Sequence, residues 1–458
     1  MSATLSSELA GLLETDAATI TDRVPASYLS DATEARGLRG HADAVVFPTS
    51  AEDVARVMAW CYEHGVAITP RGGGTGYAGG AVPDGGVVLC LGRMRRVRSL
   101  EPLLWRAEVE AGLPTADVQR LARENGLYFP PDPGAAEQSQ IGGNAATNAG
   151  GPHAFKYGVT GAWTTGVEAV VPPGRVVRFG GAVRKDVAGY DLRSLLIGSE
   201  GTLGIITALN LRFIPPPEHR YPVLACFAGA RAGAAAIEAC LASGVVPAAL
   251  EYLDNDAVNL AGATCPVAIP RSCFVVIAEA DGSGAEASEG REALIEVLCE
   301  GAVELHAPKD AREIDALWRW RDGVGLAADA ALGGKVSEDI AVPIDRLADA
   351  IEETRNIGRR HRLATCSWGH AGDGNLHSTF LFARADAEAR ERANTAAEDL
   401  FALAAALGGT VSGEHGVGVV KAGQLSRQWN PVATGLHDGV KALFDPEGLL
   451  NPGKKVSR

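Results

Sequence analysis

The chain has 458 residues, of which 46% are hydrophobic and 21% charged, and its formal net charge is −14 at pH 7. A chain of this length predicts two or three domains at about 150 residues each, and the acidic balance argues against a nucleic-acid partner, because phosphate recognition needs basic surfaces. Its eight cysteines are scattered without a CxxC pair, which favours reduced thiols and a cytoplasmic protein over disulfides, iron–sulfur clusters or zinc ribbons.

The first half of the chain alternates predicted strands and helices. Residues 45–47 and 66–69 read as strands, and Thr49 and Ser50 offer caps for a helix that ends at Gly65. Further strands are expected at 86–91, 105–110, 167–171 and 203–211, and a second helix begins at Thr115 and ends at Gly126. This pattern indicates an α/β beginning.

The pattern changes after three consecutive prolines at 215–217, which cannot continue a helix or strand interior. Beyond them, strands are predicted at 221–227 and 274–278 and helices at 231–241 and 286–299. This alternation predicts a second, α+β domain. Residues 1–16 lack a basic start followed by an apolar stretch, and no run approaches about 20 apolar residues, so neither a secretory signal nor a membrane span is expected.

A glycine-rich loop at 71–80 is the first chemical signal. Gly74, Gly76 and Gly79 fit the GxGxxG pattern, but residues 80–86 contain a proline and three glycines and cannot form the helix that a Rossmann fold requires. Consecutive glycines still let backbone N–H groups approach an anion such as a diphosphate. On the loop alone, a glycine-rich surface turn stays an equal alternative.

Two later segments, 141–151 and 198–207, also consist largely of small residues, which would let a flat ring lie against the backbone. The four stretches 70–80, 130–134, 141–151 and 191–207 together resemble the FAD-binding domain of the vanillyl-alcohol oxidase and p-cresol methylhydroxylase superfamily. The agreement of four stretches in this order makes the signal specific.

The resemblance implies a set of FAD contacts. The residues implied at the diphosphate are Gly72, Gly73, Gly74, Thr75 and Gly76. Those implied near the flavin are Gly142, Gly143, Asn148 and Gly150, and those toward the adenine are Gly204 and Ile205. Arg71, Pro131, Gly134 and Asn451 complete the cofactor-binding set. We expect non-covalent FAD, because the loop lacks histidine and cysteine and Tyr77 does not stand where the family's histidine does.

Histidines around two glycine-rich segments indicate a metal site. His370 and His377 flank a Gly-Asp-Gly turn that would bring both imidazoles to one side, and a second segment supplies Glu414. Imidazole and carboxylate donors suit a divalent ion of the zinc or manganese class. Asp373 is either a fourth ligand or a cap for turn N–H groups.

This set resembles the metal ligands of the D-2-hydroxyacid dehydrogenase branch, which includes D-lactate, glycolate and D-2-hydroxyglutarate dehydrogenases. By the same resemblance, His415 matches a substrate-contacting histidine that would act as general base, Arg321 a carboxylate-binding arginine and Lys335 a substrate lysine. Arg319 is the rival of Arg321, and the spacing to Lys335 is about one residue short.

Two substrate positions depart from the diacid-using relatives. Gly325 stands where they carry a hydroxyl, and Thr379, a further expected substrate contact, stands where they carry Asn. Both departures argue against 2-hydroxyglutarate. The resemblance therefore implies FAD-dependent oxidation of a lactate- or glycolate-like D-2-hydroxy acid by hydride transfer, assisted by a divalent metal. A flavin subunit of a multi-subunit glycolate dehydrogenase and an oxygen-using oxidase are the alternatives.

The predicted fold class is α+β, with a two-part FAD-binding domain of the p-cresol methylhydroxylase type and an α+β cap domain with an antiparallel sheet. The expected domains are a helical extension (1–38), the FAD-binding domain (39–217), the cap domain with the metal site (218–425) and a C-terminal segment that returns to the FAD domain (426–458). The expected partner is an electron acceptor, namely an electron-transfer flavoprotein, cytochrome, quinone or iron–sulfur subunit. A homodimer and a peripheral membrane contact through the acceptor stay open.

Overall fold

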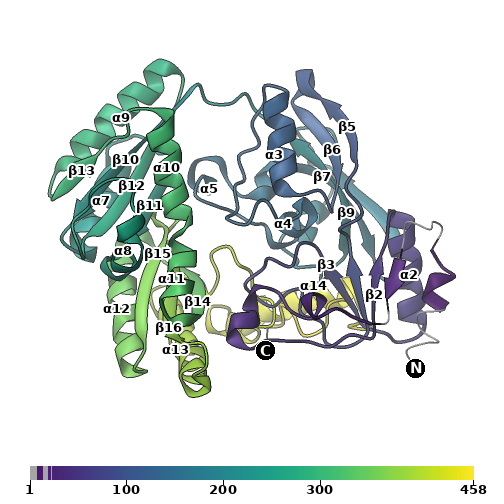
Figure 1. Ribbon diagram of the computed structural model, residues 1–458. Helices are drawn as coiled ribbons and strands as arrows, with labels where there is room; N and C mark the ends of the chain where they lie inside the picture. The colour runs from purple at the N-terminus through teal and green to yellow at the C-terminus, as the bar shows by residue number, and fades with distance from the viewer. Residues whose placement is uncertain (1–7, 14–18, 22, 458) are drawn as a thin grey trace. The chain divides into compact units, whose positions relative to one another are not determined.

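The computed structural model describes residues 8–13, 19–21 and 23–457, and the chain divides into two compact units. The first unit comprises Met1–Gly150, Gly158–Pro216 and Glu414–Arg458, and the second comprises Gly151–Tyr157 and Pro217–Gly413. Figure 1 follows the chain from purple to yellow through both. One crossing falls in the proline run at 215–217. Residues 414–425, which the sequence assigned to the cap domain, belong to the first unit.

A small, mostly parallel sheet in the first unit leads into the glycine loop. Its strand order is β1 (Thr19–Thr21), β2 (Ala44–Phe47), β4 (Val87–Cys90) and β3 (Ile68–Arg71), with β1 antiparallel to β2 and the others parallel. Helix α2 (Ala51–Glu63) follows β2, and the Ser50 hydroxyl accepts the Asp53 N–H at 3.0 Å as its N-cap. Since β3 ends at Arg71, the loop starts at the carboxyl edge of this sheet.

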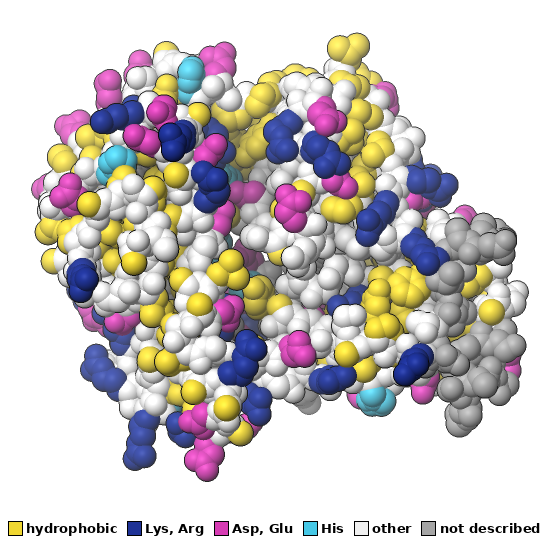
Figure 2. Space-filling view, in the orientation of Figure 1, with side chains coloured by type: hydrophobic (Ala, Val, Ile, Leu, Met, Phe, Trp, Pro, Cys, Tyr) yellow, Lys and Arg dark blue, Asp and Glu magenta, His cyan; other side chains and the backbone are white. Residues whose placement is uncertain are grey.

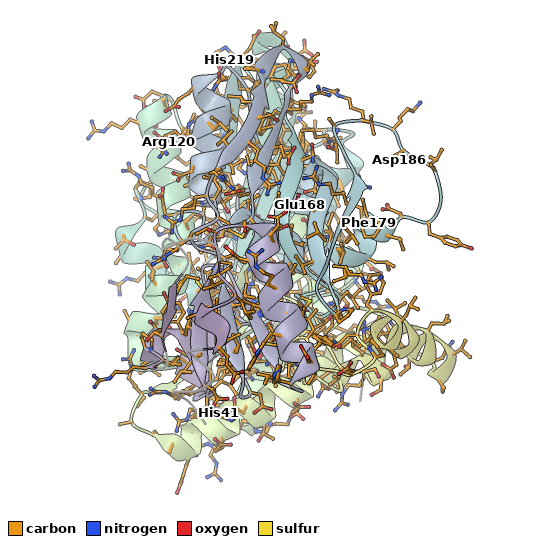
Figure 3. The ribbon with its side chains drawn as sticks, turned by 90° about the vertical axis from the view of Figure 1, so that its right-hand side faces the viewer. His41, Arg120, Glu168, Phe179, Asp186 and His219 are labelled. Carbon is orange, nitrogen blue, oxygen red and sulfur yellow. The ribbon has the colours of Figure 1, made fainter. Side chains whose placement is uncertain are left out.

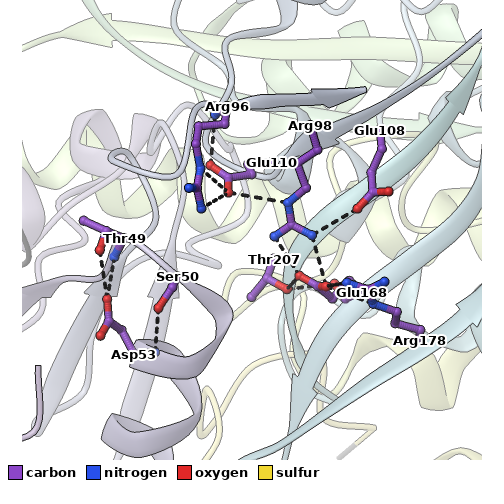
Figure 4. Close-up of polar contacts among 10 residues, drawn as sticks. All are labelled: Thr49, Ser50, Asp53, Arg96, Arg98, Glu108, Glu110, Glu168, Arg178 and Thr207. Carbon is purple, nitrogen blue, oxygen red and sulfur yellow. Dashed lines mark hydrogen bonds and ion pairs between the residues drawn. The ribbon is translucent and has the colours of Figure 1, made fainter. Parts of the chain in front are cut away.

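A five-stranded antiparallel sheet completes the first unit. Its order is β5 (Val97–Glu101), β6 (Arg106–Glu110), β9 (Ile205–Arg212), β7 (Thr164–Val171) and β8 (Arg175–Gly180). Figure 4 shows a network of charged side chains that spans these strands: Arg98 binds Glu108 and Glu168 at 2.9–3.1 Å, and Arg178 also binds Glu168. Burial would raise the pKa of Glu168, but the arginines outweigh it and hold that pKa below its usual range.

The residues after β8 form a loop that is exposed from 182 to 191 and leads into α6 (Leu192–Leu196). Figure 3 shows Asp186 in this loop, extending away from the strand that carries Phe179. The other first-unit helices are α3 (Thr115–Glu124), α4 (Ile141–Thr147) and α14 (Pro431–Phe444).

The second unit is built on a seven-stranded sheet in which all neighbours are antiparallel, as predicted. Its order is β13 (Glu304–His306), β10 (His219–Phe227), β12 (Phe274–Gly282), β11 (Ala249–Leu253), β15 (Ala364–His370), β16 (Asn375–Ala383) and β14 (Gly333–Ala341). Because side chains alternate between the faces of a strand, the register places Glu251, His370, His377 and Lys335 on one face.

Helices cover both faces of this sheet. Helices α8 (Asn255–Ala261), α10 (Ala311–Asp322) and α11 (Val324–Leu332) pack on the face that carries His370, in a core that contains Leu253, Ile277 and Trp320. Helices α7 (Ala230–Ala242), α9 (Gly284–Cys299) and α12 (Leu347–Arg360) cover the opposite face, and α13 (Ala387–Ala406) packs beside α12. His370 therefore lies on the face of the sheet that α8, α10 and α11 cover.

The remaining helical segments are short. They are α5 (Ala154–Tyr157) and the 3-10 helices η1 (Ala26–Tyr28), η2 (Ala32–Arg36), η3 (Pro102–Leu104), η4 (Thr160–Trp163), η5 (Gly262–Thr264), η6 (Ile344–Arg346), η7 (Ala371–Asp373) and η8 (Gln424–Arg427). None of the described helices combines the length and apolar character that crossing a bilayer requires. Basic and acidic side chains alternate over the visible surface (Figure 2).

The structure departs from the sequence expectations at several elements. Within 1–38, expected to be a helical extension, residues 8–10 and the 3-10 helices η1 and η2 are helical, but residues 19–21 form β1 beside β2. Residues 1–7, 14–18 and 22 lie outside the described part. Strands β5 and β8 and helix α4 were not predicted.

Candidate functional site

Two histidines occupy the two arms of a tight hairpin in the second unit. Strand β15 ends at His370, β16 begins at Asn375, and Trp368 pairs with His377 across the ladder. Gly374 has φ of 66°, and a Cβ there would lie 2.0 Å from the Val342 carbonyl oxygen. The predicted chain reversal therefore exists, and the two imidazole centroids lie 5.4 Å apart at an angle of 86°.

Glu414 joins the two histidines. One ligand atom from each of His370, His377 and Glu414 lies within 4.8 Å of those of the other two, with both histidines buried. Glu414 directly follows Gly413, where a Cβ would lie 2.1 Å from the Asn375 amide nitrogen. Two imidazoles and a carboxylate are donors that zinc-class ions accept, so these residues fit a divalent metal. Asp373 is exposed and is not among the clustered donors.

Glu251 is a functional candidate that the sequence reasoning missed. It lies on β11 directly opposite His370, is fully buried, and its Oε1 is 2.7 Å from the His370 Nδ1. Burial would raise the pKa of Glu251, but Arg321 and His370 outweigh it, so that pKa lies below its usual range. The one local signal was a glutamate inside the apolar run 249–253.

The structure separates the two rival arginines of α10. Arg321 is buried, forms an ion pair with Glu251, and its Nη2 lies 3.4 Å from the His370 Nδ1. Its buried Nε has no hydrogen-bond partner among the described residues. Arg319 is exposed and donates its Nε–H to the Asp315 carbonyl of its own helix at 3.2 Å. Arg321 therefore lies with the metal-ligand candidates, and Arg319 does not.

Lys335 lies on β14, on the same sheet face. Its amine donates to the Gly325 carbonyl at 3.0 Å and pairs with Asp329 at 2.9 Å. A Cβ on Gly325 would lie 3.9 Å from the Lys335 amine, so the position where relatives carry a hydroxyl does adjoin this lysine. The Thr379 hydroxyl is 2.8 Å from that of Ser337.

His415, the expected base, belongs to the first unit. Its ring stacks on that of Tyr77 with centroids 4.9 Å apart and an angle of 26°. As the residue after Glu414, it has its Cα about 3.8 Å from that of the candidate metal ligand. Tyr77 lies in the glycine loop, so this stack links the loop to the segment that carries Glu414.

The glycine loop has the shape that close backbone approach requires. Gly74 has φ of 69°, and a Cβ on Gly73 would lie 2.1 Å from the Gln138 carbonyl oxygen. The Arg71 guanidinium donates to the Ser30 and Ser27 carbonyls at 2.8 and 2.7 Å. Arg71, expected at the cofactor, thus connects the start of the loop to residues 27–30. The loop opens no helix, so the Rossmann interpretation is excluded as the sequence indicated.

The second predicted cofactor segment folds as helix α4. A Cβ on Gly142 would lie 2.4 Å from the Ala111 Cβ, so the glycine lets α4 pack closely. Asn148 ends the helix with φ of 54°, and its side chain accepts the Gly161 N–H at 2.8 Å. Gly150 follows at the end of the first segment of the unit.

Other predicted cofactor residues lie in the same unit. The Pro131 carbonyl accepts a hydrogen bond from Gln119 at 2.8 Å, and Gly204 directly precedes Ile205, the buried first residue of β9. The Asn451 amide donates to the Gly80 and Glu200 carbonyls at 3.0 and 2.8 Å. Asn451 thereby ties the C-terminal segment to the glycine loop.

These segments fit FAD by two observations. An added Cβ would meet no atom within 4 Å at three predicted contacts, namely Gly76, Gly134 and Gly143. The buried side-chain oxygens of Gln140 and Asn451 have no hydrogen-bond partner among the described residues. Free space beside the backbone and unpaired buried acceptors suit a ligand that carries hydroxyl and ring N–H donors, and FAD is such a ligand.

Comparison with known families supports FAD as the cofactor. A family model for the C-terminal domain of FAD linked oxidases matches residues 216–455, and one for an FAD binding domain matches residues 42–180.

The chain is also similar to curated relatives over most of its length. It is 36% identical over 420 residues to the glycolate oxidase subunit GlcD of Bacillus subtilis, covering 91% of this chain and 89% of that protein. It is 34% identical over 426 residues to the D-lactate dehydrogenase of Anaerostipes hadrus, with 90% and 89% covered. It is 33% identical over 432 residues to the mitochondrial D-2-hydroxyglutarate dehydrogenase of Rattus norvegicus, with 92% and 79% covered.

Solved structures share the fold. Substrate-bound p-cresol methylhydroxylase superposes with a TM-score of 0.81 at 17% identity, covering 99% of this chain and 96% of that one. The 4-ethylphenol oxidase of Gulosibacter chungangensis gives a TM-score of 0.78 at 19% identity, with 99% and 97% covered. The predicted p-cresol methylhydroxylase-type fold and FAD-dependent class are thus confirmed, and the chain belongs to the FAD-linked oxidase family of flavin-dependent oxidoreductases.

Proposed function

We propose that this chain oxidises a small D-2-hydroxy acid, lactate- or glycolate-like, to its 2-keto acid. The observation that carries the proposal is a set of groups. His370, His377 and Lys335 lie on one face of the seven-stranded sheet, Arg321 of α10 pairs with Glu251 on that face, and Glu414 completes the candidate metal cluster. Relatives named for glycolate and D-lactate support the substrate class.

The two cations would bind the substrate carboxylate. Lys335 is oriented by the Gly325 carbonyl, and Arg321 is fixed by Glu251 while its buried Nε–H still lacks an acceptor. Charge-assisted hydrogen bonds from a lysine and an arginine to one carboxylate are strong and directional. Burial of the arginine strengthens them further, because less water competes.

His370, His377 and Glu414 would hold a divalent metal, which supplies Lewis-acid stabilisation of the substrate hydroxyl oxygen. FAD, held non-covalently by the first unit, would supply the acceptor for the hydride from Cα. His415 would take the hydroxyl proton, a general-base contribution of about 10²–10⁴-fold. Tyr77 stacks on the His415 ring and limits its orientations.

The residues around Lys335 favour a monocarboxylate. Gly325 offers no side-chain donor beside the lysine, and the Thr379 hydroxyl is already hydrogen-bonded to Ser337. A second substrate carboxylate would therefore gain few partners at these positions. We accordingly propose lactate or glycolate in preference to 2-hydroxyglutarate, although one relative is named for the diacid.

A second candidate function concerns the electron acceptor. The Bacillus subtilis relative is named as a subunit of glycolate oxidase. We propose that this chain likewise passes electrons to a separate redox partner, such as an electron-transfer flavoprotein, a cytochrome, a quinone or an iron–sulfur subunit. Release of hydrogen peroxide in air at the rate of substrate oxidation would instead identify an oxidase.

The test is anaerobic reduction of the FAD-loaded protein by D-lactate, L-lactate, glycolate and D-2-hydroxyglutarate in turn. Reduction is measured as the loss of visible flavin absorbance at about 450 nm. We expect D-lactate or glycolate to bleach the flavin fastest. Prior treatment with a chelator should slow bleaching by at least about 10²-fold while the oxidised spectrum is unchanged.

Each arm can contradict the proposal separately. A flavin that no 2-hydroxy acid bleaches would refute the substrate class. Equal bleaching rates before and after complete metal removal would refute the metal role and leave the substrate class intact. Faster reduction by D-2-hydroxyglutarate than by the monocarboxylates would overturn the specificity argument from Gly325 and Thr379.

A further inference from the structure

Glu251 is the buried group that connects the candidate metal ligands to the candidate substrate cation. It lies in the middle of β11 and is fully buried. One carboxylate oxygen is 2.7 Å from the His370 Nδ1, and the other is paired with Arg321. A buried carboxylate is costly unless its partners are well placed, so these two contacts define what Glu251 does.

The contact with His370 fixes the proton on that ring. A carboxylate can only accept, so the 2.7 Å contact requires an N–H on the His370 Nδ1. In the neutral ring the lone pair that can bind a cation is then on Nε2. The Arg321 Nη2 is 3.4 Å from the same Nδ1 and is also a donor. That longer contact cannot compete, because charge-assisted hydrogen bonds are short.

The sheet register makes this arrangement rigid. Glu251 pairs with His370 across adjacent antiparallel strands, and all five residues of β11 are buried. Directly opposed residues have Cβ atoms about 4.5–5.5 Å apart, which suits a direct carboxylate–imidazole hydrogen bond. The position of His370 thus depends on a strand that lies more than 100 residues earlier in the chain.

A second glutamate on the same sheet provides a natural comparison. Glu279 on β12 is also fully buried and is also held by one histidine and one arginine, His153 at 3.0 Å and Arg220 at 2.8 Å. His153 is not one of the clustered metal donors. The two glutamates therefore match in burial and in having one histidine and one arginine as partners. They differ in that Glu279 also accepts the Trp318 indole N–H at 2.7 Å, and in whether their histidine is a candidate ligand.

We propose that Glu251 is a positioning residue of the metal site, which holds His370 in the Nε2-binding tautomer and orients Arg321 beside it. The proposal rests on the proposed function through the metal cluster. Carboxylates that accept from a ligating histidine raise its basicity and fix its ring, and their loss costs about 10–100-fold in metal affinity. Glu251 would thus couple metal affinity to the orientation of the substrate cation.

The experiment compares Glu251→Gln with Glu279→Gln in the FAD-loaded, full-length protein. The dissociation constant for Zn²⁺ is measured by competition with a chromophoric chelator, and bound Co²⁺ is followed by its visible absorption. We expect Glu251→Gln to weaken Zn²⁺ binding by about 10–100-fold with the Co²⁺ coordination number retained. Glu279→Gln should stay within about twofold of wild type, because its partner His153 is not one of the clustered donors.

A second variant separates positioning from folding. Glu251→Gln leaves Arg321 buried without its anion, which can destabilise the unit by itself. The double variant Glu251→Gln with Arg321→Met removes both charges, so it should fold at least as well as the single variant. We expect it to keep the 10–100-fold loss of Zn²⁺ affinity.

The possible outcomes distinguish a failure of the positioning role from a failure of the proposed function. Zn²⁺ affinity in Glu251→Gln equal to wild type, or restored in the double variant, would overturn the positioning role while the metal site stands. A Co²⁺ spectrum showing one ligand fewer would also overturn it, by making Glu251 a direct ligand. A wild-type protein that binds neither Zn²⁺ nor Co²⁺ would remove the metal from the proposed function, and this inference with it.

Discussion

Arg319 and Arg321 lie on one helix two residues apart, and they differ in burial and in partners. Arg321 is buried and ion-paired, whereas Arg319 is exposed. We predict that Arg321→Lys lowers kcat/KM for the hydroxy acid by about 10–100-fold, because lysine lacks the planar fork and one charged hydrogen bond is worth about 1.5–3 kcal/mol. Anaerobic flavin reduction measures the effect. Arg319→Lys should change it less than about twofold; an equal loss in both variants would remove Arg321 from substrate binding.

The sequence predicted candidate site residues where they lie together in short segments of the chain. His370, His377 and Glu414 stand out because histidines and an acid lie among glycines, and the structure gathers them. Glu251 was missed, since its partner His370 is brought to it by the pairing of β11 with β15. Local sequence cannot reveal such a cross-strand pair. The roles of these residues in binding and catalysis stay predictions.

At the level of elements, the turn between β15 and β16 requires a glycine at position 374. Gly374 has φ of 66°, and an added Cβ would lie 2.0 Å from the Val342 carbonyl oxygen. We predict that Gly374→Ala destabilises the protein by about 1–3 kcal/mol, because both the left-handed conformation and the clash oppose a side chain. Shifting the hairpin should also weaken Zn²⁺ binding, measured by chelator competition beside urea unfolding.

Gly301 provides the matched control for this turn. It lies in the same unit with φ of 76°, but an added Cβ would meet no atom within 4 Å. Gly301→Ala should therefore cost about 1 kcal/mol for the left-handed backbone alone and leave Zn²⁺ affinity unchanged. If the two variants were equally stable and equally able to bind Zn²⁺, the turn geometry would not govern the cluster.

Elements were predictable where burial imposes a pattern. Strands β2, β4 and β12 are apolar runs, and α2 shows helical spacing after a Ser cap. Strands β5 and β8 were missed because their arginines and mostly unburied side chains carry little hydrophobic signal. Helix α4 contains two glycines, which disfavour a helix by about 1 kcal/mol each; close packing on Ala111 overrides that preference.

For the whole molecule, the resemblance supplied what local pattern could not, namely the return of the C-terminal segment to the first unit. Glu200 accepts the N–H groups of Val417 and Gly418 at 2.8 and 2.6 Å and pairs with Lys455 at 3.0 Å. These contacts span more than 200 residues of sequence. They explain why residues 414–425 join the first unit, earlier than the boundary expected at 426.

The fully buried Glu279 makes the stability of the whole protein dependent on acid pH. Burial would raise its pKa, but His153 and Arg220 outweigh burial and lower the pKa from 4.5 to about 2. The folded state therefore binds this proton less readily than the unfolded state. The stabilisation, on the order of 3 kcal/mol, is present above pH 4.5 and is lost as the pH falls through about 2.

We predict that Glu279→Gln lowers the free energy of unfolding at about pH 6–7, where the native carboxylate is fully ionised, and flattens its decline between pH 4.5 and 2. Urea unfolding followed by circular dichroism across this range measures both effects. Glu292→Gln, at an exposed position on α9, should leave the curve close to wild type. An unchanged slope in Glu279→Gln would mean that the carboxylate takes up its proton equally readily in the folded and unfolded chains, and that its ion pairs with His153 and Arg220 add no acid sensitivity.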